Sequence, residues 1–140
     1  MNVGFYSFYR LEFSQIYILN IKIKDKLPAN NIYIYSENTT KQRINKREAL
    51  NKIIDDYNQK IIDCIVFENL KALGSDFYMR SKILKILIEN NINFIFLEEN
   101  IVSTSLIKKE KIEMMIFMAD TLKEEHDRRS KIGNNIKKYR

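Results

Sequence analysis

The side chains best suited to bind a charged ligand lie at the C-terminal end of the chain. Residues 128–140, the basic tail, hold six basic side chains and no acidic one, and these are Arg128, Arg129, Lys131, Lys137, Lys138 and Arg140. Because the whole chain has a formal net charge of +6, all of the excess lies in this tail. Such a cluster is either a solvated chain end or an arm that neutralises phosphates, with binding that weakens as salt rises.

Other common chemistries find little support in the sequence. His126 is the single histidine and has no Cys or His neighbour at ligand spacing, so no metal site is expected. Three scattered glycines cannot build a phosphate loop or a dinucleotide fingerprint, and we expect no cofactor. Glu98 and Glu99 could act as paired carboxylates, although such a pair is more often a solvated strand end. Cys64 lies in an apolar run, which indicates a core thiol in a reducing compartment.

The composition predicts one ordered domain. A chain of 140 residues that is 45% hydrophobic can bury a core, and with 3 Gly and 1 Pro it has few breakers of regular structure. No apolar stretch is long enough to span a bilayer, and the N-terminus lacks the layout of a signal peptide. We therefore expect a soluble, cytoplasmic protein with no membrane partner.

Strands and helices alternate along the expected fold. Strands are expected at residues 2–9, 31–37, 61–67 and 92–97, and helices at 16–27, 47–59 and 77–89. The helix at 16–27 is ambiguous, because its residues partly alternate like a strand, and the helix at 47–59 has Asn45 as its expected cap. A polar loop is expected at 38–46. This order predicts an α/β fold around a parallel-rich sheet.

A long helical segment is expected at 108–131. It is apolar nearly all round between Met114 and Ala119, so it needs cover on two sides, and its own sheet can supply one. The alternatives are a deeply buried helix and a dimer interface. We favour the interface, formed by Met114, Met115, Phe117, Met118 and Leu122.

One stretch near the middle of the chain is the most informative. Residues 65–76 read Ile-Val-Phe-Glu-Asn-Leu-Lys-Ala-Leu-Gly-Ser-Asp, an apolar strand that runs into a turn. This stretch resembles the active-site strand and turn of serine recombinases, the resolvase/invertase family. Further similar patches follow in the family's order, and they are Val3-Gly4-Phe5, residues 34–37, 46–50 and 94–101, and Glu124 or Glu125 with Arg128. The resemblance implies a mainly parallel sheet with helices on both faces and a long C-terminal helix.

The same resemblance implies a degenerate active site. In the family a serine after the first strand attacks the DNA phosphate, and arginines hold the phosphate oxygens. Read against the family's glycine, Gly4 puts Ser7 at an arginine position and Tyr9 at the serine position. The positions of the family's aspartate and two arginines after the third strand read Lys71, Ala72 and Ser75, and Arg47 alone has a clear counterpart. We expect a recombinase-like protein without catalysis.

Two of these residues keep an alternative interpretation. Tyr9 is either a replacement nucleophile or a partly exposed aromatic at a strand end, and we favour the second, because a phenol reaches further than a serine hydroxyl. Ser7 is a second candidate nucleophile, with Arg10 or Lys71 helping. Lys71 itself is either a surface charge or a phosphate contact.

The sequence therefore leaves three alternative functions. The first is an inactive relative with a core at 1–127 and the basic tail at 128–140, without a helix-turn-helix domain, which dimerises through its long helix. It would bind DNA weakly and with little sequence preference, as a homodimer or as a heterodimer with a full-length serine recombinase whose site-specific recombination it modulates. The second is an active strand-exchange enzyme that uses Tyr9 or Ser7. The third is an α/β protein-interaction module without a DNA role.

Overall fold

Four of the five strands of the sheet run parallel. The structure is a computed structural model and describes residues 1–37, 47–74, 77–103 and 110. The strand order is β2-β1-β3-β4-β5. The strands are β1 (Asn2–Ser7), β2 (Asn31–Ser36), β3 (Cys64–Phe67), β4 (Phe94–Phe96) and β5 (Ile101–Val102). β5 pairs antiparallel with β4, where Ile95 lies opposite Val102.

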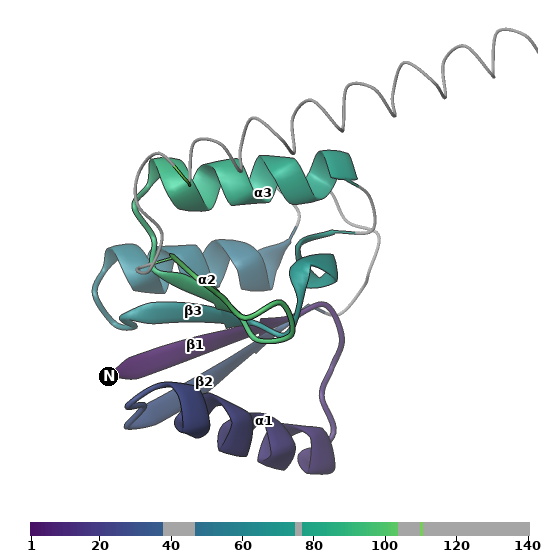
Figure 1. The fold of residues 1–140 in the computed structure, drawn as a ribbon, viewed down its shortest axis with the longest axis vertical. Coiled ribbons are helices and arrows are strands. Elements are labelled where there is room, and N and C mark those ends of the chain that lie inside the picture. The colour runs from purple at the N-terminus through teal and green to yellow at the C-terminus, as the bar shows by residue number, and fades with distance from the viewer. Residues whose placement is uncertain (38–46, 75–76, 104–109, 111–140) are drawn as a thin grey trace, which may run out of the picture.

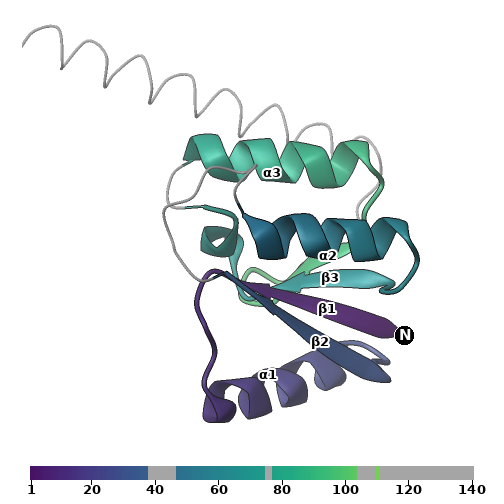
Figure 2. The same ribbon diagram turned by 180° about the vertical axis from the view of Figure 1, so that it is seen from behind.

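Helices cover both faces of this sheet. Helix α1 (Phe13–Lys26) lies on one face, and α2 (Glu48–Asn58) and α3 (Phe77–Glu89) lie on the other, as Figures 1 and 2 show from opposite sides. A short 3₁₀ helix, η2 (Leu70–Leu73), follows β3. The expected fold class, a mainly parallel sheet with helices on both faces, is confirmed.

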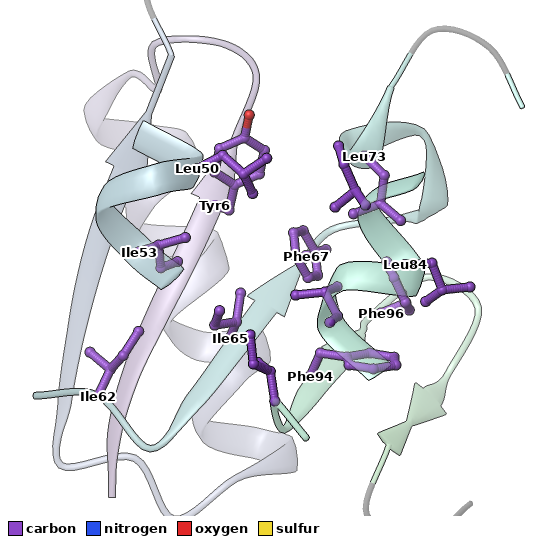
Figure 3. Packing of buried hydrophobic residues seen from close by; sticks show 13 residues of the cluster. Tyr6, Leu50, Ile53, Ile62, Ile65, Phe67, Leu73, Leu84, Phe94 and Phe96 are labelled. Carbon is purple, nitrogen blue, oxygen red and sulfur yellow. The ribbon is translucent and has the colours of Figure 1, made fainter. Parts of the chain in front are cut away.

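The core forms two layers because successive strand residues point to opposite faces. In β1, Val3 and Phe5 pack in the cluster under α1, whereas Tyr6 packs in the cluster under α2 and α3. Figure 3 shows the second cluster, in which Phe67, Phe94 and Phe96 lie together. A Cβ on Gly4 would come within 2.7 Å of the Ile62 side chain, so glycine lets this layer pack closely on β1.

Most of the predicted elements are confirmed, with shifted ends. The ambiguous segment at 16–27 is a helix that begins earlier, at Phe13, where the Glu12 N–H donates to Gln15 Oε1 over 2.9 Å. The third strand begins at Cys64 and not at residue 61, because the N–H groups of Ile61 and Ile62 donate to the Asp56 carbonyl at the end of α2. β4 is shorter than expected.

Two elements and one cap were not expected from the sequence. These are η2, β5 and the N-cap of α2, which lies at Arg47 and not at Asn45. The polar loop at 38–46, and the long helix at 108–131 apart from residue 110, lie outside the described residues. No helix within the described ranges has the length and apolarity needed to cross a membrane.

Candidate functional site

A pocket of about 190 Å³ opens where the carboxyl ends of β1 and β3 meet. In an open parallel sheet, this edge is the usual place for a ligand site. We call it the strand-end pocket, and the described residues that line it are Phe5, Tyr6, Ser7, Phe8, Tyr9, Glu68, Asn69, Lys71 and Ala72. Four residues that the sequence assigned to a degenerate active site therefore come together, namely Ser7, Tyr9, Lys71 and Ala72.

Ser7 is held by the backbone that follows it. Its hydroxyl donates to the Tyr9 carbonyl oxygen over 2.8 Å and accepts from the Tyr9 N–H over 3.1 Å. The side chain is largely buried, whereas Tyr9 is 67% exposed. Ser7 would have to give up its bond to the Tyr9 carbonyl before its hydroxyl proton could go to a base.

The turn after β3 is fixed by polar contacts from the next strand end. Asn69 caps η2 by accepting from the Ala72 N–H over 3.1 Å, and its amide donates to Glu98 Oε2 over 2.8 Å. Glu99 Oε1 accepts from the Leu70 N–H over 3.0 Å. Glu98 and Glu99 therefore do not act as paired carboxylates but brace the turn that carries Lys71 and Ala72.

Arg47 lies beneath this edge, almost fully buried. Its Nη1 donates to the Leu73 carbonyl oxygen over 2.6 Å, and its Cζ lies 4.3 Å from the centre of the Phe8 ring. A guanidinium over an aromatic face is stabilised by the ring's negative face. Arg47, the arginine that the sequence matched to the family's pattern, is thus bonded inside the protein and ties η2 to the segment that follows β1.

A buried acid lies in the same region. Glu37, at the end of β2, is 3% exposed, and its Oε1 accepts from the Ala49 N–H in the first turn of α2, a position where a negative charge is favoured. Burial raises the pKa of Tyr6 well above its usual value; the Glu37 carboxylate raises it further, and the Arg47 guanidinium opposes both. Tyr6, Glu37 and Arg47 are therefore close enough to interact electrostatically.

The end of η2 lies close to the first turn of α3. Arg80 Nε donates to the Gly74 carbonyl oxygen over 2.8 Å, which joins α3 to the turn. A Cβ on Gly74 would lie 2.7 Å from both Cβ and Cγ of Met79, so any larger residue would push η2 away from α3.

The pocket offers few groups for phosphate chemistry. Among the described residues that line it, Lys71 is the only cation and Glu68 the only acid, and no arginine is present. A single ammonium can pair with a phosphate, but it cannot form the two parallel bonds of a guanidinium. The part of the chain that the structure describes contains no group of three or more His, Cys, Asp or Glu side chains that could hold a metal ion.

Several predicted site residues lie outside the described ranges. Ser75 is one of them. The same holds for the six basic residues of the tail and for the expected interface residues Met114, Met115, Phe117, Met118 and Leu122.

Sequence reasoning missed three residues that shape the site. Phe8 provides the ring under Arg47, Asn69 caps η2, and Glu37 holds the start of α2. A signal existed for Glu37, since an acid directly after a predicted parallel strand lies at the edge where ligand sites form. Nothing in the sequence marked Phe8 as the partner of an arginine 39 positions away.

Comparisons with known proteins found a matching family model and solved structures with a similar fold. The family model described as "Resolvase, N terminal domain" matches residues 15–140, a range that begins within α1, after Ser7 and Tyr9. The crystal structure of the N-terminal catalytic domain of TP901-1 integrase has a TM-score of 0.68 at 16% identity, over 91% of this chain and 98% of that one. A resolvase family site-specific recombinase from Streptococcus pneumoniae has a TM-score of 0.63 at 17% identity, over 99% of this chain and 97% of that one. No curated protein matches the sequence.

Proposed function

Because this chain belongs to the resolvase family, whose N-terminal domain matches residues 15–140, we propose that it is a serine recombinase-like protein without strand-cleaving activity. It uses the family's scaffold to associate with DNA or with an intact recombinase. The proposal has two parts, which are the absence of strand cleavage at the strand-end pocket and the association with DNA or a recombinase.

The observation that carries the proposal is the position of Arg47. Its guanidinium is bonded to the Leu73 carbonyl and stacked on Phe8, so it is not available to a phosphate at the pocket. Phosphoryl transfer needs donors aimed at the oxygens where charge develops, and loss of one such donor typically slows a reaction by about 10²–10³-fold. Lys71 is the only cation among the described residues that line the pocket. Several such donors are therefore missing, and their losses in rate would combine.

The nucleophile position also supports inactivity. Ser7 is bonded to the Tyr9 backbone in both directions, and no histidine lies in the described ranges to act as its base. Tyr9 is exposed at the end of β1, as expected for an aromatic side chain at a strand end.

A second candidate function has one observation in its favour. The pocket brings Ser7, Tyr9 and Lys71 together, which is the minimum set for a hydroxyl nucleophile with a cation beside it. If wild-type protein forms a covalent adduct with nicked DNA, Tyr9→Phe and Ser7→Ala identify the residue. Loss of the adduct in one variant alone would establish an active enzyme and end the proposal of inactivity.

The proposed partners follow from the charge and the apolar pattern of the C-terminal segment. The six basic residues of the tail would contact the DNA backbone, and Met114, Met115, Phe117, Met118 and Leu122 would form a homodimer or a heterodimer with a full-length serine recombinase. Through such mixed dimers the protein would modulate site-specific recombination. A cytoplasmic location, where Cys64 stays reduced, belongs to the same proposal.

The DNA part of the proposal is tested by binding to a duplex of random sequence over a range of salt concentrations. With six phosphate contacts, the logarithm of the binding constant should fall with a slope of about −5 against the logarithm of salt. Deleting residues 128–140 should abolish binding, whereas Lys71→Ala should leave most of it. Absence of binding at low salt, or binding that survives the deletion, would favour a protein-interaction module without a DNA role.

The recombinase part is tested in a mixed reaction. A full-length serine recombinase acts on its own site while this chain is added in increasing amounts. We expect the recombination rate to change. The matched variant Met115→Lys should remove that change, because it places a charge in the expected interface of the long helix. An unaltered rate at saturating amounts of this chain would contradict modulation of that recombinase.

A further inference from the structure

Helix α1 carries a second apolar face that packs against none of the residues that the structure describes. Leu19 and Ile23 point into the core under the sheet. On other sides of the helix, Phe13 is 92% exposed, Tyr17 69%, Ile21 54% and Ile18 51%. We call the surface formed by Phe13, Tyr17, Ile18 and Ile21 the α1 outer face.

These side chains form one continuous strip. Phe13, Tyr17 and Ile21 follow one another at intervals of four residues, so they lie along one side of the helix, with Ile18 beside them. Together they expose roughly 500 Å² of apolar surface, since one large aromatic side chain covers about 150–250 Å² when buried. A strip of this size is comparable to the largest apolar patch on a typical monomer, and such a patch is often functional.

We propose that the α1 outer face binds the same face of a second copy of this chain, with the two helices antiparallel around a twofold axis near Tyr17. The inference does not rest on the proposed DNA function. It concerns the face of the sheet opposite to α2 and α3, as Figures 1 and 2 show.

The area of the strip supports a second copy as the occupant. In a twofold contact each copy offers the same patch, so the buried surface doubles to roughly 1,000 Å². This is about the lower limit for a specific protein interface, which predicts a reversible dimer. Aromatic side chains at its centre are the residues that most often dominate such contacts.

The charges beside the strip determine the orientation. Lys22, Lys24, Asp25 and Lys26 are exposed in the last turns of α1, past most of the strip, so this end carries more positive than negative charge. A parallel pair would place these lysines against their own copies. In an antiparallel pair they face the other end of the partner helix, where Arg10 and Glu12 compensate each other. Antiparallel helix dipoles also favour this arrangement.

The mass of the full-length chain in solution, measured by sedimentation over a range of concentrations, tests the proposal. Tyr17→Lys places a charge at the centre of the strip and should weaken one association step at least tenfold. Asn58→Lys is the matched control, because it adds the same charge at an exposed position of α2, on the opposite face of the sheet. Far-UV circular dichroism checks that both variants fold.

The result also separates this contact from the proposed long-helix dimer. If both contacts exist, the wild type reaches a tetramer and Tyr17→Lys stops at a dimer. If only the α1 contact exists, the wild type is a dimer and Tyr17→Lys a monomer. A wild type that stays monomeric, or a Tyr17→Lys mass equal to that of wild type and Asn58→Lys at every concentration, would overturn the α1 contact.

Cross-linking tests the orientation. With a short bifunctional thiol reagent, Phe13→Cys and Ile21→Cys proteins should link when mixed and should link poorly alone. Cys64 is buried, so the wild type serves as the unlinked control. Strong links between two Phe13→Cys chains would contradict the antiparallel pair.

The same variants test whether a membrane surface, and not a second copy, binds the α1 outer face. Co-sedimentation with vesicles of phosphatidylserine and phosphatidylcholine should be equal for wild type and Tyr17→Lys. If wild type instead binds these vesicles, Tyr17→Lys does not, and their masses agree, the α1 outer face is a lipid-binding surface and the proposal is wrong.

Discussion

Two neighbouring regions at the carboxyl edge of the sheet use their polar groups in opposite ways. In the first, the arginine cluster, Arg47 is buried against Phe8 and the Leu73 carbonyl, with Glu37 and Tyr6 nearby. In the second, the strand-end pocket, Lys71 is exposed, and no arginine appears among the described residues that line it.

The difference bears on the proposal that this chain keeps a recombinase scaffold without strand-cleaving chemistry. A guanidinium that points at a ligand can take part in catalysis, whereas one bonded to a backbone carbonyl inside the protein contributes to stability. In this chain the buried cluster holds η2, β1 and α2 together. We therefore expect the fold to depend more on Arg47 than on the residues that line the pocket.

The largest expected effect is on the arginine cluster. Arg47→Met removes the bond to the Leu73 carbonyl, the contact with Phe8, and the guanidinium that lies near the buried Glu37 carboxylate. We expect the free energy of unfolding to fall by about 3 kcal/mol or more, measured by urea unfolding.

Arg47→Lys is the matched control for charge. An ammonium keeps the positive charge but loses the planar stack and the shape of the donor, so it should recover only part of the loss. If Arg47→Met changed stability by less than about 0.5 kcal/mol, in the range of an ordinary surface substitution, the structural role of this arginine would be refuted.

The next effect concerns the turn that both regions share. Gly74→Ala places a Cβ within 2.7 Å of Met79 Cβ, which the helix α3 cannot relieve by rotating a side chain alone. We expect a destabilisation of about 1–3 kcal/mol, as for other overpacked sites, read from thermal or urea unfolding. If Gly74→Ala left the free energy of unfolding unchanged, the turn could move away from α3 without loss of stability.

The pocket should be far less sensitive. Lys71→Ala removes an exposed side chain that makes no hydrogen bond or ion pair with the described part of the chain, so the free energy of unfolding should change by less than about 0.5 kcal/mol. The same unfolding assay as for Arg47→Met provides the direct comparison. A loss comparable to that of Arg47→Met would erase the contrast between the two regions.

The smallest predicted effect lies at the far end of α2 and depends on pH. The Tyr35 hydroxyl donates to Asp56 Oδ2 over 2.6 Å and Lys52 Nζ lies 2.9 Å from Oδ1; these contacts lower the pKa of Asp56. A lowered pKa gives stability that is present above the unfolded pKa of about 3.9 and is lost as the pH falls through the folded pKa. Between pH 5 and pH 3, the urea midpoint of wild type should therefore drop more than that of Asp56→Asn. Equal drops would show that Asp56 makes no contribution.

The sequence predicted the sheet well because the strands are strongly apolar and bounded by polar turns. Helix α1 was ambiguous for a physical reason: it has one apolar face in the core and another exposed, so its pattern approaches alternation. β5 was missed because two residues give no periodicity. Ile61 and Ile62 were assigned to a strand because backbone bonds to the Asp56 carbonyl leave no trace in hydrophobicity.

The site was predicted in part. The register of the motif brought Ser7, Tyr9, Lys71 and Ala72 to one pocket, because residues at the ends of adjacent parallel strands meet. The burial of Arg47 could not be predicted, since a charged side chain is exposed by default and its partners, Phe8 and the Leu73 carbonyl, are distant in sequence.

The central claim is that this scaffold no longer cleaves DNA, and trapping on a suicide substrate tests it most directly. Wild-type protein is incubated with nicked duplex DNA that releases its end after cleavage, beside an active serine recombinase on its own site, and covalent products are resolved under denaturing conditions. The account predicts an adduct for the active recombinase and none for this chain. A covalent adduct with this chain that is lost in Ser7→Ala or Tyr9→Phe would contradict it.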